Sequence, residues 1–248
     1  MWKSQRVSVI LPTYNEKDSI RACVRTFLET GLVDEVIVIN NNAAPGTSEE
    51  VAGTGAIEFV ERTQGYGAAI RRGFREATGE LIAVCEPDGT FESADIEKLL
   101  VYTTDFDFVL GSRTTKEFIW EGANMGHFLK WGNYAVAKLM EVLFNTNSLT
   151  DVGCTYRVIR RNSLEAIEPH FTINGSFFGP EMMLLALKAR VPMVQIPLNY
   201  KKRVGTSAVT GSPVKAFKLG CQMIMLILKH KFLTHYAFKF KKSYVRKK

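Results

Sequence analysis

Two acidic side chains directly follow an apolar stretch of the chain. Residues 81–85 (LIAVC) are followed by Glu86, Pro87, Asp88 and Gly89. Carboxylates one residue apart on a tight turn can reach one hard cation, and Mg²⁺ or Mn²⁺ binds a few carboxylates together with phosphate oxygens. Such a cation neutralises charge on a leaving diphosphate. Acids are also common in ordinary turns, so the metal site predicted at Glu86 and Asp88 depends on the residues that accompany it.

Polar and aromatic residues follow two other apolar stretches. Residues 6–11 lead into LPTYNE, and a second stretch leads into NNNAAPGT at 40–47. Ligands of open parallel sheets bind at the carboxyl ends of strands, so one nucleotide can lie across all three strand ends. Tyr14 offers a ring for stacking, and Glu16 can accept a hydrogen bond from a nucleoside. The sequence lacks the dinucleotide-binding glycine fingerprint and the P-loop.

The elements that must position these residues alternate between strands and helices. Continuous β-branched runs predict buried strands, and apolar residues at helical spacing predict the helices between them. The predicted strands are 6–11, 35–39, 57–60, 81–85, 106–110, 155–159 and 193–200. The predicted helices are 16–30, 47–53, 67–78, 94–102, 124–144 and 178–189. This alternation indicates an α/β fold with a Rossmann-like, mostly parallel sheet flanked by helices.

The charge of the chain is divided unevenly along its length. The 248 residues carry a net charge of +7, yet no Asp or Glu follows Glu181, so residues 182–248 carry +15 and residues 1–181 carry −8. This separation favours an anionic partner for the last third, although a solvated basic tail has the same composition. No secretory signal is apparent, and the four cysteines lack paired spacing, which predicts a cytoplasmic protein with reduced thiols.

Residues 214–232 (VKAFKLGCQMIMLILKHKF) form an apolar segment with basic flanks. Its apolar centre, residues 219–228, is shorter than the roughly 20 residues of a membrane span. A basic amphipathic helix of this kind suits the membrane interface, whereas the alternatives are a helix that covers the sheet and a contact between subunits. We therefore expect a catalytic domain over residues 1–210 and an interfacial or packing helix with a tail over 211–248.

Taken together, these motifs resemble the family 2 glycosyltransferases of the GT-A fold. The order of SVILPTYNE, the asparagine-rich stretch and the acid-x-Asp motif is similar to theirs. The downstream half resembles the branch of dolichyl- or polyprenyl-phosphate mannose and glucose synthases. The residues that carry the second resemblance are Gly111-Ser-Arg113, Trp131-Gly-Asn133, Asp151 to Arg157, Phe178-Gly-Pro-Glu181 and Lys201 to Gly205. The resemblance covers residues 6–210.

The resemblance implies a role for each matching residue. It places the nucleotide against the end of the first strand and the start of the asparagine run, at Pro12, Thr13, Tyr14, Glu16, Ile39 and Asn41. It assigns the metal and diphosphate to Glu86, Pro87 and Asp88. It also implies that Arg113 meets phosphate or acceptor, that Arg203 with Lys202 clamps phosphate, and that Asp151 and Glu181 face the reacting sugar or acceptor.

The sequence departs from the family pattern at three points. Asn40 and Asn41 stand where the family has paired aspartates, which leaves the preferred base open because an amide both donates and accepts hydrogen bonds. Glu86 replaces an aspartate, so the charge is kept and the reach is longer. Ala208 stands where the family has a lysine, which changes the expected grip on phosphate or lipid.

These observations predict an inverting, metal-dependent glycosyltransferase that uses GDP-mannose or a UDP-hexose. The expected acceptor is a polyprenyl or dolichyl phosphate at the cytoplasmic face of an anionic membrane, where a separate membrane protein could assist. A lipid phosphate is already an anion, whereas a sugar hydroxyl in lipid-linked or surface polysaccharide would need a base, for which Asp151 is the candidate. A non-catalytic sugar-nucleotide-binding or membrane-surface scaffold is the alternative from another class. Nucleic-acid binding is not expected, because the tail lacks an aromatic and basic stacking platform.

Overall fold

The computed structural model describes residues 1–123, 127–146, 148–205 and 213–240. Its strands are β1 (Val7–Thr13), β2 (Glu35–Asn40), β3 (Ile57–Val60), β4 (Leu81–Val84), β5 (Phe108–Ser112), β6 (Arg157–Arg160) and β7 (Met193–Pro197). Its α-helices are α1 (Lys17–Glu29), α2 (Thr47–Val51), α3 (Tyr66–Glu76), α4 (Ile96–Tyr102), α5 (His127–Phe144), α6 (Arg161–Ile167), α7 (Phe178–Lys188) and α8 (Pro213–Phe232). Short 3₁₀ helices lie at Ser93–Asp95, Lys116–Phe118 and Glu168–His170.

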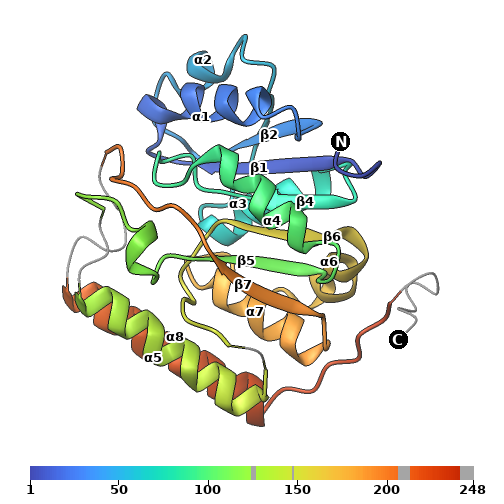
Figure 1. The fold of residues 1–248 in the computed structure, drawn as a ribbon, viewed down its shortest axis with the longest axis vertical. Helices are drawn as coiled ribbons and strands as arrows, with labels where there is room; N and C mark the ends of the chain where they lie inside the picture. Colours follow the sequence, from blue (N-terminus) through green and yellow to red (C-terminus); the bar gives the residue numbers. More distant parts are fainter. Residues whose placement is uncertain (124–126, 147, 206–212, 241–248) are drawn as a thin grey trace.

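The described strands form one mixed, mostly parallel sheet (Figure 1). Their order is β3-β2-β1-β4-β6-β5-β7, and only β6 runs antiparallel to its neighbours, β4 and β5. The strands β1, β2 and β4 are parallel, so their carboxyl ends meet at one edge of the sheet. The predicted α/β fold with a mostly parallel sheet is confirmed, and the three polar strand ends share that edge.

The sheet is buried on both faces, which explains the continuous apolar runs. Successive side chains of β1 point to opposite faces, so Ile10 joins one hydrophobic cluster while Val9 and Leu11 join the other. The helices α1 and α4 cover the face of Val9 and Leu11. The helices α3, α5, α6 and α7 cover the face of Ile10.

The C-terminal helix α8 packs against α5 and α7 (Figure 1). Met223, Ile227 and His230 are buried on its inner side, while Met225 and Phe232 are each 62% exposed. The helix therefore packs on the domain with one face and turns an apolar face outward. Within the described parts of the chain, no helix is both long enough and apolar enough to cross a membrane.

Candidate active site

The acid motif forms a tightly bonded turn at the carboxyl end of β4. Asp88 is 1% exposed, and its Oδ1 accepts hydrogen bonds from the backbone N–H of Thr90 at 2.9 Å and from the Thr90 hydroxyl at 2.6 Å. The carbonyl oxygen of Pro87 accepts a hydrogen bond of 2.6 Å from the Ser19 hydroxyl in α1. These contacts fix the backbone of the turn and leave Oδ2 of Asp88 directed at another group.

That group is the guanidinium of Arg203. One of its terminal nitrogens, Nη1, lies 2.9 Å from Oδ2 of Asp88 and 3.6 Å from Oε2 of Glu86. The other, Nη2, donates a hydrogen bond of 2.9 Å to Oε1 of Glu16. Carboxylates from the ends of β1 and β4 thus converge on one guanidinium. Arg203 follows the nearest of these acids, Asp88, by 115 residues in the sequence.

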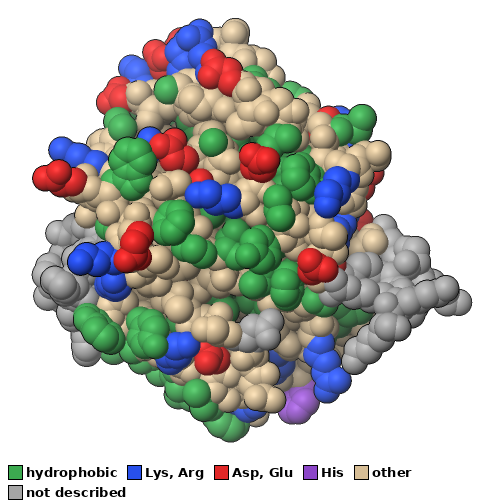
Figure 2. Space-filling view, viewed as in Figure 1, with side chains coloured by type: hydrophobic (Ala, Val, Ile, Leu, Met, Phe, Trp, Pro, Cys, Tyr) green, Lys and Arg blue, Asp and Glu red, His purple; other side chains and the backbone are tan. Residues whose placement is uncertain are grey.

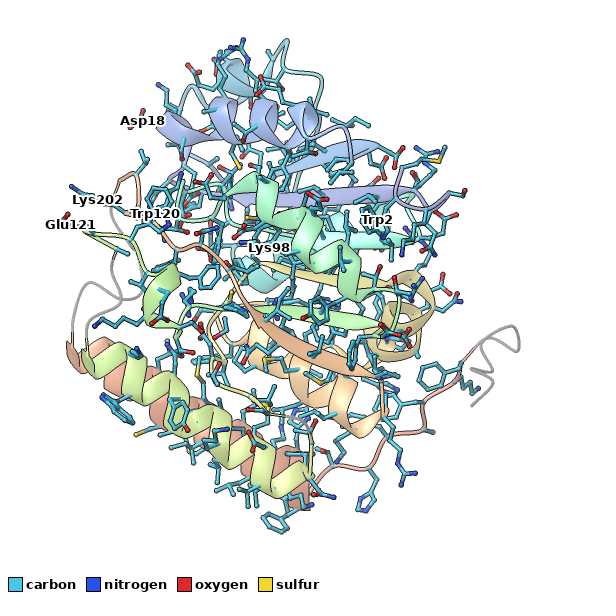
Figure 3. All side chains as sticks on the ribbon, viewed as in Figure 1. Trp2, Asp18, Lys98, Trp120, Glu121 and Lys202 are labelled. Carbon is cyan, nitrogen blue, oxygen red and sulfur yellow. The ribbon has the colours of Figure 1, made fainter. Side chains whose placement is uncertain are left out.

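The segment that carries Arg203 is held against the acid turn by its backbone. The N–H of Lys201 donates to the carbonyl of Thr90 at 2.7 Å, and the N–H of Val204 donates to the carbonyl of Asp88 at 2.9 Å. The neighbouring Lys202 is exposed and lies beside the turn at Gly122, near Glu121 and Trp120 in Figure 3. Of the two predicted phosphate-binding cations, Arg203 faces the acids and Lys202 does not.

The Glu86 carboxyl is the most perturbed acid of this cluster. Burial and the nearby Asp88 carboxylate raise its pKa to about 8, although the Arg203 guanidinium acts in the opposite direction. Two carboxylates so close together repel each other, and the cost falls when a cation is present. The turn is therefore an electrostatic site that favours a positive charge.

The residues that the sequence predicts to border the nucleotide lie at the end of β1. Pro12 pairs with Ile39 in the register of β1 and β2, and Tyr14 is 45% exposed beyond the strand. Oε2 of Glu16 accepts hydrogen bonds from the backbone N–H groups of Tyr14 and Asn15 at 2.7 and 2.9 Å. Ile39 is fully buried in the core, so its side chain supports this edge and does not reach its surface.

Thr13 carries a buried polar atom without a partner at the same edge. Its side chain is 2% exposed, and its hydroxyl has no hydrogen-bond partner among the described residues. A buried hydroxyl that stays unpaired is unfavourable, so such a group at a ligand-binding edge is a candidate ligand contact.

The asparagines that replace the family's aspartates are engaged within the protein. Asn41 is 3% exposed, and its amide nitrogen donates to the carbonyls of Glu61 and Thr63, each at 2.8 Å. Its amide oxygen accepts from the N–H of Gly65 at 2.8 Å. Asn40 likewise donates to Ser48 at 3.1 Å and accepts from a backbone N–H. Asn41 therefore holds the loop before α3, and it can contact a base only by giving up these bonds.

Glu181 differs from its expected position facing the sugar. It is fully buried in α7, where its carboxylate accepts hydrogen bonds from the N–H and hydroxyl of Thr172 at 3.0 and 2.5 Å and from the N–H of Ile173 at 3.1 Å. The loop it holds lies against the start of α3, where a Cβ at Gly67 would come within 2.5 Å of the Ile173 carbonyl. The geometry gives Glu181 a structural role in holding this loop.

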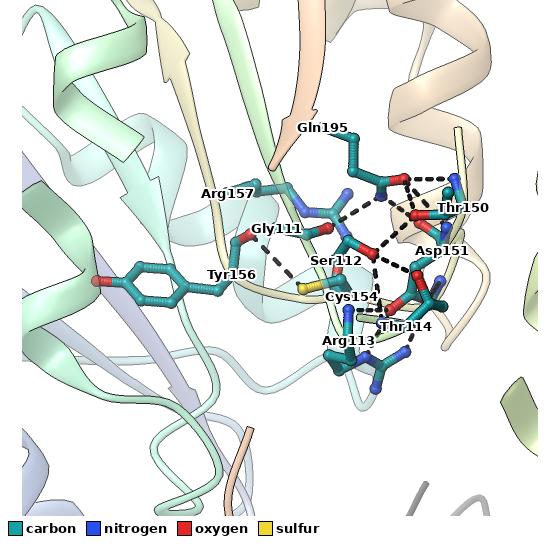
Figure 4. Close-up of polar contacts among 11 residues, drawn as sticks. Gly111, Ser112, Arg113, Thr114, Thr150, Asp151, Cys154, Tyr156, Arg157 and Gln195 are labelled. Atoms are coloured by element: carbon teal, nitrogen blue, oxygen red, sulfur yellow. Dashed lines mark hydrogen bonds and ion pairs between the residues drawn. The ribbon is translucent and has the colours of Figure 1, made fainter. Parts of the chain in front are cut away.

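Arg113 and Asp151 form a closed ion pair at the end of β5 (Figure 4). Nε and Nη2 of Arg113 donate to Oδ2 and Oδ1 of Asp151 at 2.8 and 3.0 Å. The backbone N–H groups of Arg113 and Gly153 complete the contacts of the two carboxylate oxygens. Gln195 in β7 fixes the segment that leads into Asp151 by accepting from the N–H groups of Thr150 at 2.7 Å and Asp151 at 3.0 Å.

The electrostatics of this pair argue against the predicted base. Burial favours the neutral acid, but the Arg113 guanidinium outweighs it and lowers the pKa of Asp151. The side chain of Asp151 has no exposed surface, while that of Arg113 is 14% exposed. The carboxylate of Asp151 thus has a lowered pKa and no exposed surface, and its hydrogen bonds hold the partly exposed Arg113 guanidinium in place.

Two aromatic residues at the site were missed by sequence reasoning. Tyr66 begins α3, and its buried hydroxyl has no hydrogen-bond partner among the described residues. Tyr200 lies under Arg113, with 5.3 Å between the guanidinium carbon and the ring centre. The only sequence signal for Tyr66 is its place between two glycines, and Tyr200 carries none.

The acid turn fits a divalent cation by its donor chemistry. Glu86 and Asp88 already share one positive group, the Arg203 guanidinium. Among the described residues, no three acid, histidine or cysteine side chains gather as a complete metal cage. Mg²⁺ needs no such cage, because it commonly binds through one or two carboxylates together with phosphates and water. Glu86 and Asp88 are the residues that would hold it.

The sheet order and the acid motif at its edge are those of the GT-A fold. Solved structures of glucosyl-3-phosphoglycerate synthase from Mycobacterium tuberculosis share this fold. One complex with Mn²⁺, UDP-glucose and phosphoglyceric acid has a TM-score of 0.73 and 16% identity, covering 94% of this chain and 82% of that chain. Another complex, with Mg²⁺ and UDP, has a TM-score of 0.72 and 14% identity, and the match covers 94% of this chain and 81% of that chain.

The sequence profile described as glycosyl transferase family 2 matches residues 8–168. The chain therefore belongs to that family and is a glycosyltransferase. It is 28% identical over 212 residues to the low-salt glycan biosynthesis hexosyltransferase Agl6 of Haloferax volcanii, covering 84% of this chain and half of that protein. It is 22% identical over 231 residues to dolichyl-phosphate beta-glucosyltransferase of Saccharomyces cerevisiae, which covers 81% of this chain and 68% of that protein. It is 25% identical over 223 residues to undecaprenyl-phosphate mannosyltransferase of Micrococcus luteus, covering 84% and 89%.

Proposed function

We propose that the chain transfers a hexose from a nucleotide sugar, GDP-mannose or a UDP-hexose, to a polyprenyl or dolichyl phosphate. The names of two relatives specify a dolichyl-phosphate or an undecaprenyl-phosphate acceptor. The acid turn and the polar end of β1 supply a site for the donor. Residues Pro12, Thr13, Tyr14 and Glu16 border the nucleoside in this proposal, with Asn41 behind them.

The proposed acceptor class rests on one observation, the ion pair in which Arg113 and Asp151 are joined by two hydrogen bonds. A sugar hydroxyl must lose a proton as it attacks, yet both oxygens of Asp151 are bonded inside the protein. A lipid phosphate is already an anion near pH 7 and needs no such base. The exposed part of Arg113 offers it a positive group, and Asp151 holds that group in place.

The proposed reaction is a direct displacement with inversion. A phosphate oxygen of the acceptor forms a bond to the anomeric carbon, and the bond from that carbon to the diphosphate oxygen breaks. The departing nucleoside diphosphate takes the electron pair. A divalent cation bound at Glu86 and Asp88 would neutralise charge on the diphosphate. Arg203 lies within reach of the same charge and is the side chain we assign to it.

The described surface of α5 and α8 supports contact with a membrane. Five large hydrophobic side chains here are each more than 60% exposed: Trp131 and Val142 on α5, Met225 and Phe232 on α8, and Leu233 directly after α8. Hydrophobic side chains lie beside lysine or arginine along the lower edge of Figure 2, where α5 runs in Figure 1. Apolar side chains with basic neighbours suit an anionic membrane interface. We propose that the enzyme is peripheral at the cytoplasmic face.

Transfer can be tested with purified protein, Mn²⁺, radiolabelled UDP-glucose or GDP-mannose, and a short polyprenyl phosphate in detergent. The proposal expects a lipid-extractable labelled product whose sugar is released by mild acid. Asp88→Asn should lower the rate by about 100-fold or more. The exposed Glu97→Gln, on α4, is the matched control and should keep the rate. In a parallel reaction that offers a lipid-linked sugar in place of the polyprenyl phosphate, transfer to that sugar alone would select the alternative acceptor, and no transfer with any donor would reject the proposal.

Membrane contact can be tested by sedimentation with vesicles of neutral lipid alone or with added anionic lipid. Binding should require the anionic lipid and weaken with salt. Met225→Glu should reduce it, because a carboxylate would face the bilayer. Val101→Glu is the matched control, since Val101 is 49% exposed on α4, which covers the other face of the sheet. Equal binding by both variants would reject the proposed surface.

A further inference from the structure

Arg203 occupies the point where three carboxylates meet. Its Nη1 contacts Asp88 and Glu86, its Nη2 contacts Glu16, and its side chain is 21% exposed. Glu16 arrives from the end of β1, while the other two acids follow β4. The acids are thus spread around the guanidinium, and within the described residues no three of them stand close enough together to hold a metal ion themselves.

Among the described residues, no other basic side chain forms an ion pair with these acids. Arg113 is bonded to both oxygens of Asp151, and Lys202 is exposed beside the turn at Gly122. Arg203 therefore supplies the positive charge that lets the carboxylates lie together. Replacing a charged partner inside such a cluster is costly unless another cation takes its place.

A metal ion and Arg203 would compete for the same oxygen. Oδ1 of Asp88 is occupied by Thr90, so Oδ2, which contacts Nη1 at 2.9 Å, is the oxygen left for a ligand. Mg²⁺ binds carboxylate oxygens at about 2.0–2.1 Å, which leaves no room for a guanidinium on the same oxygen and the same side. The cation can therefore bind fully only after Arg203 has moved.

A diphosphate offers Arg203 a new partner. Guanidinium groups bind phosphate oxygens through paired hydrogen bonds, and the diphosphate brings its charge next to the cation. The backbone on both sides of Arg203 is bonded to the acid turn through Lys201 and Val204, so the side chain can turn while its segment stays near. Phosphate binding by Arg203 and cation binding by the acids thus favour each other.

We propose that Arg203 is a built-in substitute for the divalent cation, and that it makes metal binding depend on the nucleotide diphosphate. The identity of the donor rests on the proposed function. The new element is the order of binding, in which the nucleoside diphosphate precedes the divalent ion. The ion alone binds weakly because it must displace Arg203. With the nucleoside diphosphate present, Arg203 moves to phosphate and the acids become free for the ion.

The test measures Mn²⁺ affinity by the electron paramagnetic resonance signal of free Mn²⁺, without lipid and without turnover. The wild type should bind Mn²⁺ weakly alone and about fivefold or more tightly with UDP or GDP. Arg203→Gln should bind Mn²⁺ alone more tightly than the wild type by a similar factor, and should lose most of the gain from nucleotide. Arg25→Gln, which removes an exposed positive charge on α1, should behave as the wild type.

Two further results keep the inference separate from the proposed function. Arg203→Lys keeps the charge and should restore part of the weak Mn²⁺ binding, while circular dichroism confirms that each variant is folded. If Arg203→Gln binds Mn²⁺ alone no more tightly than the wild type, the inference is overturned even when hexose transfer is observed. If Arg203→Gln does bind it more tightly but no donor supports transfer, the proposed function fails and the competition between Arg203 and the ion stands.

Discussion

Arg113 and Asp151 face each other with two parallel hydrogen bonds of 2.8 and 3.0 Å, and the side chain of Asp151 is fully covered. Such geometry is the strong, paired form of the arginine–carboxylate contact. Its consequence is that a carboxylate which the sequence suggested as a base is the anchor of a cation. This arrangement supports the proposed phosphate acceptor, which needs no base.

Asp151→Asn should destabilise the fold as well as impair transfer. The substitution leaves the Arg113 guanidinium without its anionic partner in a largely buried position, which costs about 3–5 kcal/mol. Urea unfolding measures the loss. Asp18→Asn, an exposed aspartate on α1, is the matched control and should change the free energy of unfolding by less than about 1 kcal/mol. A large loss of transfer with unchanged stability would return Asp151 to the role of base.

Glu181→Gln should loosen the loop that precedes α7. One carboxylate oxygen becomes an amide nitrogen, which cannot accept from Thr172 or Ile173, so we expect a loss of about 1–3 kcal/mol in unfolding free energy. Hydrogen exchange should show faster exchange at the N–H groups of these two residues. If Glu181 instead touched the sugar, the rate of transfer would fall while exchange and stability stayed at wild-type values.

Tyr66→Phe should separate stability from ligand binding. The Tyr66 hydroxyl is buried without a partner among the described residues, so its removal should leave the unfolding free energy unchanged or raise it slightly. If the donor supplies the missing partner, the variant should bind the nucleotide sugar several-fold more weakly. Calorimetric titration measures this binding, with the exposed Tyr102→Phe as control. Unchanged affinity would show that the hydroxyl has no ligand role.

His230 should make the fold sensitive to mild acid. Burial, together with the positive charges of Lys188 and Lys229, lowers its pKa from the ordinary 6.5 to about 4. Because the folded pKa lies below the unfolded value, this residue contributes its full stability above pH 6.5, and the contribution is lost as pH falls toward 4.

The check on His230 is the melting temperature measured from pH 7.5 to pH 4. His230→Gln should flatten the fall in melting temperature between pH 6.5 and 4, since it removes a group that protonates in the unfolded chain below pH 6.5 and stays neutral in the folded chain until about pH 4. His235→Gln replaces an exposed histidine five residues later and should retain the wild-type pH profile. Parallel profiles for the wild type and His230→Gln would contradict the assignment.

Local sequence patterns predicted most of the fold. The apolar run at 57–60 matches β3, and the run at 81–85 matches β4 to within one residue. Elements were missed or shifted where tertiary contacts decide them. The short helix α6 has little apolar periodicity of its own, and its Leu164 and Ile167 become helical positions by packing into the core.

Site residues could be predicted where the neighbouring sequence determines their position. They could not be predicted where partners far away in the sequence determine their role. Glu86 and Asp88 lie at the carboxyl end of β4 because they directly follow the apolar run that forms this strand, so the strand itself places them. The role of Asn41 depends on a loop more than 20 residues away, and that of Glu181 on its neighbours' backbone N–H groups. No residue pattern reports such contacts. Ala208, the third departure from the family pattern, lies outside the described residues.

Tyr200 gives the two positive groups of the site a common support. Its ring packs against the Arg113 guanidinium, and its backbone forms β-bridges to Phe91 and Ile119. Arg203 follows three residues later in the chain. The backbone on both sides of Arg203 is bonded to the acid turn, so a turn of the Arg203 side chain leaves Tyr200 in its place under Arg113. One short segment of chain thus fixes the distance between the anchor points of two cations, of which one is free to reorient and the other is not.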